Sequence, residues 1–184
     1  MDFTEIVATS TQLWISALVF LVIDLVLYWF LNRQISLERF KRMKWQLVLA
    51  AALFWGTFAV FLLQMFWDSY YQYIYPAWFR GAGILVTASV IYGTLALVFY
   101  WLSLRIPGNP VRNFLLLGAV ESVLEHLWGI LGVQILEVPM LREAGTIDII
   151  VVAIPEYIFY WGMVIWIAML LQRGMDWLKS KLGN

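Results

Sequence analysis

The sequence predicts an all-α integral membrane protein, a bundle of five transmembrane helices. Composition is the first reason, because 63% of the 184 residues are hydrophobic and 13% are charged, with a mean hydropathy of +0.81. These values lie well outside the range that is usual for soluble domains. The second reason is that five apolar runs are each long enough to cross about 30 Å of hydrocarbon at about 1.5 Å per residue. The third is an unequal distribution of lysine and arginine among the connections.

The five predicted helices account for most of the chain. They are Leu13–Leu31, Leu47–Trp67, Ile84–Leu104, Phe114–Leu136 and Ile147–Leu171. The connections between them are short, and no polar block of domain size remains. We therefore expect one transmembrane domain over residues 1–184, with any activity inside the bundle or at its rims.

The basic residues predict how this bundle is oriented. Ten of the twelve lie in connections or the tail on one side, and two lie on the other. Because basic residues in short loops stay cytoplasmic, we expect the N-terminus outside and the C-terminus in the cytoplasm, in the plasma or inner membrane. The most basic connection, residues 32–45, also contains Ile35, Phe40 and Met43. It is expected as a solvated loop or as a surface helix on an anionic leaflet.

Charge and cysteine content exclude several classes of protein. The net charge is zero, so the basic connection is explained by topology and no nucleic-acid binding is expected. The chain has no cysteine, which excludes disulfides, thiolate metal sites and a cysteine nucleophile. Expected partners are the lipid bilayer, a lipophilic ligand, and a second copy or a larger membrane complex. The sequence specifies no cofactor.

Aromatic residues form 17% of the chain and gather near the predicted membrane interfaces. The run from residue 67 to residue 79 is the densest group. It is expected to lie flat on the outer surface or, alternatively, to cover a lipophilic ligand.

Ionisable side chains inside the predicted helices indicate a candidate site. A charge in the bilayer interior costs between about 3 and about 15 kcal/mol, so such residues are normally buried, partnered or functional. Glu121 and Glu125 are four residues apart and share a helix face, which Trp128 continues. Gly118 and Ser122 form a small-xxx-small pair that lets another helix approach closely.

The last predicted helix brings a further carboxylate to the same depth. Glu156 follows Pro155, which removes one helical hydrogen bond, and Tyr157 and Tyr160 come next. Because neighbouring helices run in opposite directions, this carboxylate and the fourth-helix pair are expected in the outer half of the bilayer. Asp24 joins them only if the first helix packs alongside.

These positions define the predicted site. We expect acid–base roles for Glu121, Glu125, Glu156 and His126, and ligand-binding roles for Asp24, Trp128, Tyr157 and Tyr160. A dimetal centre would need two histidines in Glu-x-x-His spacing. The chain has a single histidine, adjacent to a glutamate, so no metal site is predicted.

Three functions fit this set of residues, and whether the protein is an enzyme stays open. The favoured hypothesis is an intramembrane carboxylate and histidine site that binds or converts a small lipophilic molecule by acid–base chemistry. The second is proton- or cation-linked transport, because clustered carboxylates hold an exchangeable proton. The third is an accessory or scaffold subunit of a larger complex. An enclosed aromatic cavity would favour ligand binding or conversion. A water-filled path from one membrane face would favour transport, and a fully packed core would favour the accessory subunit.

Overall fold

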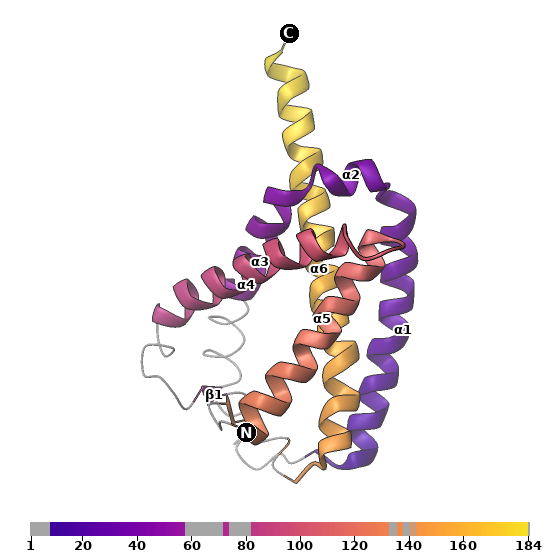
Figure 1. Ribbon diagram of the computed structural model, residues 1–184, viewed down its shortest axis with the longest axis vertical. Coiled ribbons are helices and arrows are strands. Elements are labelled where there is room, and N and C mark those ends of the chain that lie inside the picture. The colour runs from indigo at the N-terminus through magenta and orange to yellow at the C-terminus, as the bar shows by residue number, and fades with distance from the viewer. Residues whose placement is uncertain are drawn as a thin grey trace.

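The computed structural model describes residues 8–57, 72–73, 82–132, 136–137, 141 and 143–183. Within these ranges the regular secondary structure is helical except for one pair of two-residue strands, so the predicted all-α class is confirmed. In chain order the helices are α1 (Ser10–Gln34), α2 (Leu37–Lys41), α3 (Lys44–Thr57), α4 (Ala82–Ser103), α5 (Pro110–His126), the π-helix η4 (Leu127–Gly132) and α6 (Thr146–Leu182). In Figure 1, α1, α5 and α6 lie side by side, and α4 crosses them steeply.

Three helices, α1, α4 and α6, are long and apolar enough to cross a membrane. They correspond to the first, third and fifth predicted helices. The outer surface of α1 is apolar, and Leu18, Val22 and Val26 are each at least 60% exposed. A continuous apolar surface of this kind is stable against lipid rather than water.

Side-chain caps explain where two of the helices begin. Thr9 accepts a hydrogen bond from the backbone N–H of Gln12, whose side chain accepts one from Thr9 in return. This capping box satisfies donors that the first turn of α1 leaves open. Asn109 caps α5 by accepting from the backbone of Arg112, and Pro110 follows at the first helical position, where its missing N–H costs nothing.

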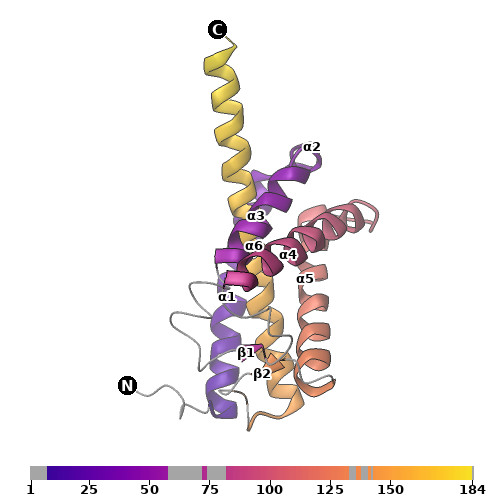
Figure 2. The same ribbon diagram turned by 90° about the vertical axis from the view of Figure 1, so that its left-hand side faces the viewer.

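Helix α6 is the centre of the bundle, because α1, α3 and α5 all pack on it. Helices α1 and α6 run in the same direction. Near their starts the indole of Trp14 donates to Asp148 at 2.9 Å, and near the far end of α1 Arg173 donates to the Gln34 side chain at 2.8 Å. Figure 2 shows that the last part of α6 projects beyond the other helices. The helix ends at Leu182, eleven residues later than predicted.

The structure corrects the end of the fourth predicted helix. Regular α-helix stops at His126, the chain continues as η4, and Leu136 lies in strand β2 (Leu136–Glu137). That strand pairs antiparallel with β1 (Gln72–Tyr73). Two glycines within η4 weaken regular helix there.

Two further sequence predictions lie largely outside the described residues. The second predicted helix is described only as far as Thr57. Of the aromatic run from residue 67 to residue 79, the structure describes only β1.

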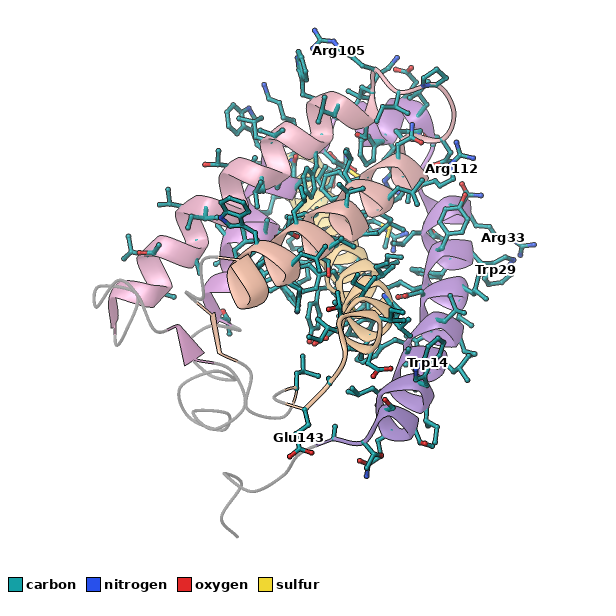
Figure 3. All side chains as sticks on the ribbon, turned by 60° about the horizontal axis from the view of Figure 1, so that its bottom comes forward. Trp14, Trp29, Arg33, Arg105, Arg112 and Glu143 are labelled. Atoms are coloured by element: carbon teal, nitrogen blue, oxygen red, sulfur yellow. The ribbon has the colours of Figure 1, made fainter. Side chains whose placement is uncertain are left out.

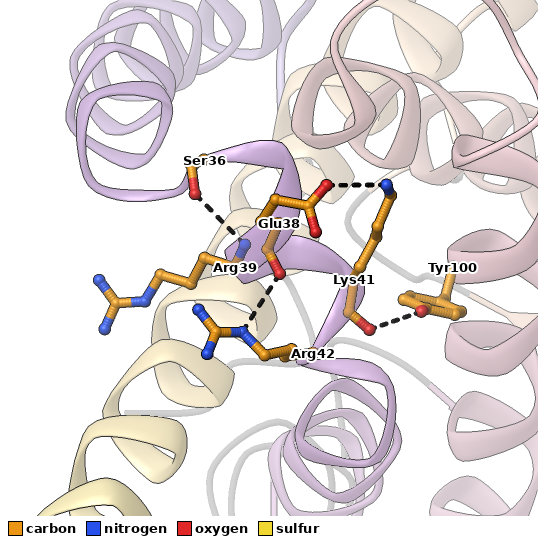
Figure 4. A network of polar contacts seen from close by, with 6 residues as sticks. All are labelled: Ser36, Glu38, Arg39, Lys41, Arg42 and Tyr100. Carbon is orange, nitrogen blue, oxygen red and sulfur yellow. Dashed lines mark hydrogen bonds and ion pairs between the residues drawn. The ribbon is translucent and has the colours of Figure 1, made fainter.

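The basic connection contains the short helix α2, and its apolar side chains pack inward against the bundle. Ile35, Phe40 and Met43 are at most 4% exposed and belong to the main hydrophobic core. The charged side chains point outward instead. Figure 4 shows Lys41 bonded to Glu38 at 2.8 Å, and the Tyr100 hydroxyl donating to the Lys41 carbonyl at 2.8 Å. The hydrogen bond from Lys41 lowers the pKa of the exposed Glu38 carboxyl.

Candidate intramembrane carboxylate site

Helices α5 and α6 approach closely where α5 presents small residues. The Ser122 hydroxyl donates to the Ala153 carbonyl at 2.9 Å. A Cβ added at Gly118 would lie 2.2 Å from Cδ1 of Trp161, so the indole occupies the space that a side chain would need. This is the close contact that the small-xxx-small spacing predicts.

The Glu125 carboxyl lies between phenols from two other helices. Tyr157 of α6 donates to Oε2 of Glu125 at 2.8 Å, and Tyr92 of α4 donates to the same atom at 3.1 Å. Both tyrosines are buried. Glu125 therefore joins α4, α5 and α6 at one point.

Glu121 lies one turn earlier on α5 and interacts with Glu125. The indole of Trp161 donates to Oε2 of Glu121 at 3.2 Å, and the two carboxyl groups lie in contact. Two bare carboxylates in contact would repel strongly, and one shared proton would remove that repulsion.

Glu156 and His126 extend the cluster. The Tyr160 hydroxyl donates to Oε1 of Glu156, and His126 lies close enough to Glu156 for an electrostatic interaction. Nδ1 of His126 lies 2.9 Å from the Ser122 carbonyl. A carbonyl oxygen can only accept, so we assign the hydrogen to Nδ1. Nε2 is therefore the ring nitrogen that carries the lone pair.

Aromatic rings surround these carboxyl groups. Trp55 of α3 stacks on Tyr92 with ring centroids 4.1 Å apart. The same indole contacts the rings of Tyr157 at 5.5 Å and Tyr160 at 5.4 Å. The rings thus place hydroxyl and indole donors beside the three carboxyl groups.

The structure brings six of the eight predicted site residues into this cluster. These six are the four predicted acid–base residues together with Tyr157 and Tyr160. Trp128 differs, because its side chain is 67% exposed. It lies in η4, where residues no longer repeat every 3.6 positions, so it does not continue the face of Glu125.

Asp24 is the other residue that lies apart from the cluster, with no hydrogen bond to it among the described residues. It lies on α1 in the contact with α6, between Phe20, which packs on Phe159 at 5.7 Å, and Leu27, which fills the space beside Gly162. The Asp24 side chain is buried, and neither carboxylate oxygen has a hydrogen-bond partner among the described residues.

Sequence reasoning missed three aromatic members of the site, Tyr92, Trp55 and Trp161. A signal existed for Tyr92 and Trp161, because both lie near the middle of an apolar run, away from the interfaces where aromatic residues usually gather. Tyrosine and tryptophan at that depth need a hydrogen-bond acceptor. The glutamates of the cluster provide one.

Comparison with known proteins finds no family model, no curated protein and no solved structure that matches this chain. The chemistry of the site therefore rests on its own geometry.

Proposed function

We propose that the protein binds a small lipophilic molecule at the carboxylate cluster and exchanges protons with it. The supporting observation is the contact between the Glu121 and Glu125 carboxyl groups, beside Glu156 and His126 and among aromatic rings. Phenols and an indole donate hydrogen bonds to these carboxyls. A carboxylic acid in such a place can be kept neutral and can donate its proton.

The reaction class best suited to this set is movement of a double bond or a similar proton shift. Glu121 provides the proton through its pair with Glu125, and Glu156 or Nε2 of His126 removes a proton from a neighbouring atom of the ligand. One proton is added and one is removed, so no oxidant or other co-reactant is needed. Rings such as Trp55 and Tyr157 stabilise positive charge that develops on the ligand.

Proton-linked transport is a second candidate, supported by two irregular helix segments at the site. Pro155 is buried inside α6 directly before Glu156 and leaves one helical hydrogen bond unmade. The π-helix η4 begins directly after His126, and such segments occur frequently at functional sites. Movement at these two segments would open the cluster to one side of the membrane.

We also propose that the chain crosses the membrane five times, with its N-terminus outside. The support is that α1 and α6 run in the same direction, which requires an odd number of crossings if α3, α4 and α5 each cross once between them. Figure 3 places Arg33, Arg105 and Arg112 toward the end opposite Glu143. Basic residues collected at one end favour that end as the cytoplasmic one.

The test of the proposed function is to compare wild type with Glu125→Gln and Glu156→Gln. Glutamine keeps the shape and a hydrogen-bonding amide but loses the exchangeable proton. Native mass spectrometry after lipid extraction would identify a bound molecule, and conversion of that molecule would be followed by chromatography. Asp176→Asn is the matched control, because Asp176 is exposed on the projecting part of α6.

The proposal expects a bound lipophilic molecule in wild type and in the control, with binding or conversion lost in both glutamine variants. If both variants fold and keep the same molecule and conversion as wild type, the acid–base role is refuted. The packed core around the fully buried Trp161 would then favour the accessory-subunit alternative.

A further inference from the structure

A second cluster of charged side chains lies where α1 ends, beside the cytoplasmic part of α6. Nε of Arg39 donates to the Gln172 side chain at 3.2 Å, and Nη1 of Arg39 donates to the Gln34 carbonyl at 3.1 Å. Arg173 donates to Oε1 of the same Gln34 at 2.8 Å. Two guanidinium groups from distant parts of the chain therefore donate hydrogen bonds to the same glutamine, Gln34.

No carboxylate in the described part of the chain forms an ion pair with either of these two arginines. Among the described residues the only ion pair joins Lys41 to Glu38. Figure 4 shows the Arg39 guanidinium directed away from that pair. Asp176, three residues after Arg173, forms no ion pair with it. Two like charges held together are unfavourable unless an anion lies between or beside them.

The two guanidinium groups keep donors for such an anion. Each carries five N–H donors in a planar fork. Arg39 uses two of them and Arg173 one in the glutamine contacts. The fork geometry of arginine matches the paired oxygens of a phosphate group, and charge-assisted bonds of this kind are the stronger ones.

The cluster lies at the level where lipid headgroups are expected. Three exposed tryptophans carry cations over their rings: Arg33 over Trp29 at 4.2 Å, Lys44 over Trp45 at 4.5 Å and Arg105 over Trp101 at 3.3 Å. Tryptophan and basic residues together are typical of the cytoplasmic membrane interface. Arg39 lies on α2, between the ends of α1 and α3 that carry two of these pairs.

We propose that Arg39 and Arg173 form a binding site for a phosphate-bearing anion, with Gln34 and Gln172 holding the two guanidinium groups in position. The anion is either the headgroup of an anionic phospholipid or a soluble phosphate. This site is separate from the carboxylate cluster, and its existence does not depend on the function proposed there.

The test uses the whole protein in nanodiscs, with Arg39→Gln and Arg173→Gln as variants. Arg105→Gln is the matched control, because it removes the same charge on the same side but from the Trp101 contact. In the first arm, nanodiscs contain phosphatidylglycerol and phosphatidylcholine, and native mass spectrometry counts retained lipid. In the second, nanodiscs contain phosphatidylcholine alone, and inorganic phosphate is titrated by calorimetry.

The site predicts that wild type retains phosphatidylglycerol in the first arm or binds phosphate in the second. Either signal should fall about tenfold in each site variant, because each variant loses one charge-assisted contact. In the control the signal should change less than twofold. The arm that responds identifies the source of the phosphate. The proposal is overturned if Arg105→Gln lowers the signal as much as the site variants do, or if neither arm detects binding. Arg173 is exposed, so Arg173→Gln tests the site even where loss of Arg39 disturbs α2.

Discussion

Glu125 holds its position through side chains that are distant in the sequence. Tyr92 and Tyr157 both donate to one of its oxygens, and the Glu121 carboxyl contacts it from the preceding turn. A carboxyl held by two donors from different helices keeps one orientation, because rotating it would break both hydrogen bonds. This order is what a proton-transfer site needs before a ligand arrives.

Tyr157→Phe tests this arrangement at the level of one atom. The change removes one donor to Glu125 and leaves the ring contacts with Trp55 and His126. We expect a loss of about 1 kcal/mol in the free energy of unfolding, together with weaker ligand conversion or binding. Thermal unfolding in detergent and the ligand assay would measure the two effects.

The control for that experiment is Tyr28→Phe on α1. Tyr28 packs against the core, and no hydrogen bond from its hydroxyl is seen among the described residues. Equal effects of the two substitutions on stability and ligand would contradict the role assigned to Tyr157.

At the scale of elements, the contact between α5 and α6 depends on the absence of a side chain at Gly118. An added methyl group would lie 2.2 Å from the Trp161 ring, which is itself fully buried and bonded to Glu121. The indole cannot move away without breaking that bond. Packing and the carboxylate site are therefore coupled at this residue.

Gly118→Ala should destabilise the protein by about 1 to 3 kcal/mol, the usual cost of overpacking a core. Gly174→Ala is the matched control, because Gly174 lies on α6 with nothing within 4 Å of an added Cβ. There the change should stabilise the helix by up to about 1 kcal/mol, since alanine is the better helix former. Unfolding of both variants by heat in detergent would measure the difference, and a Gly118→Ala protein as stable as wild type would refute the contact.

The sequence predicted helices well where an apolar run alone decides the structure, as in α1, α4 and α6. It also predicted that Glu121, Glu125 and Glu156 would meet, because helix periodicity and alternating direction are enough to place them. Tyr92 could not be placed this way, since its contact depends on how α4 crosses α5. The exposure of Trp128 depends on the π-helical winding of η4, which no residue spacing specifies. The burial of Phe40 likewise depends on the packing of α2 against the bundle.

For the whole molecule, the two ends of the α1 and α6 pair differ in chemistry. At one end Asp148 accepts hydrogen bonds from Ser10 and Trp14. At the other end Arg39 and Arg173 meet on Gln34. This polarity agrees with an outer end that holds few cations and a cytoplasmic end that faces anionic lipid.

Single cysteines test the proposed orientation against a background that contains none. A cysteine at Glu143 should react with a membrane-impermeant thiol reagent in intact cells, because this exposed position lies at the end proposed to be outside. A cysteine at Ser180, on the projecting part of α6, should react only after the membrane is opened. The reverse pattern would show that the orientation is inverted, and labelling of both in intact cells would show that α6 does not cross the membrane.

The proposed chemistry depends on a proton shared between Glu121 and Glu125. Infrared difference spectroscopy at neutral pH detects it as the carbonyl band of a protonated carboxyl group, and substitution assigns the band. We predict that wild type shows this band, that Glu121→Gln removes it, and that Asp176→Asn leaves it unchanged. A wild-type spectrum without a protonated carboxyl band, or a band that persists at full strength in Glu121→Gln, would contradict a proton shared by this pair.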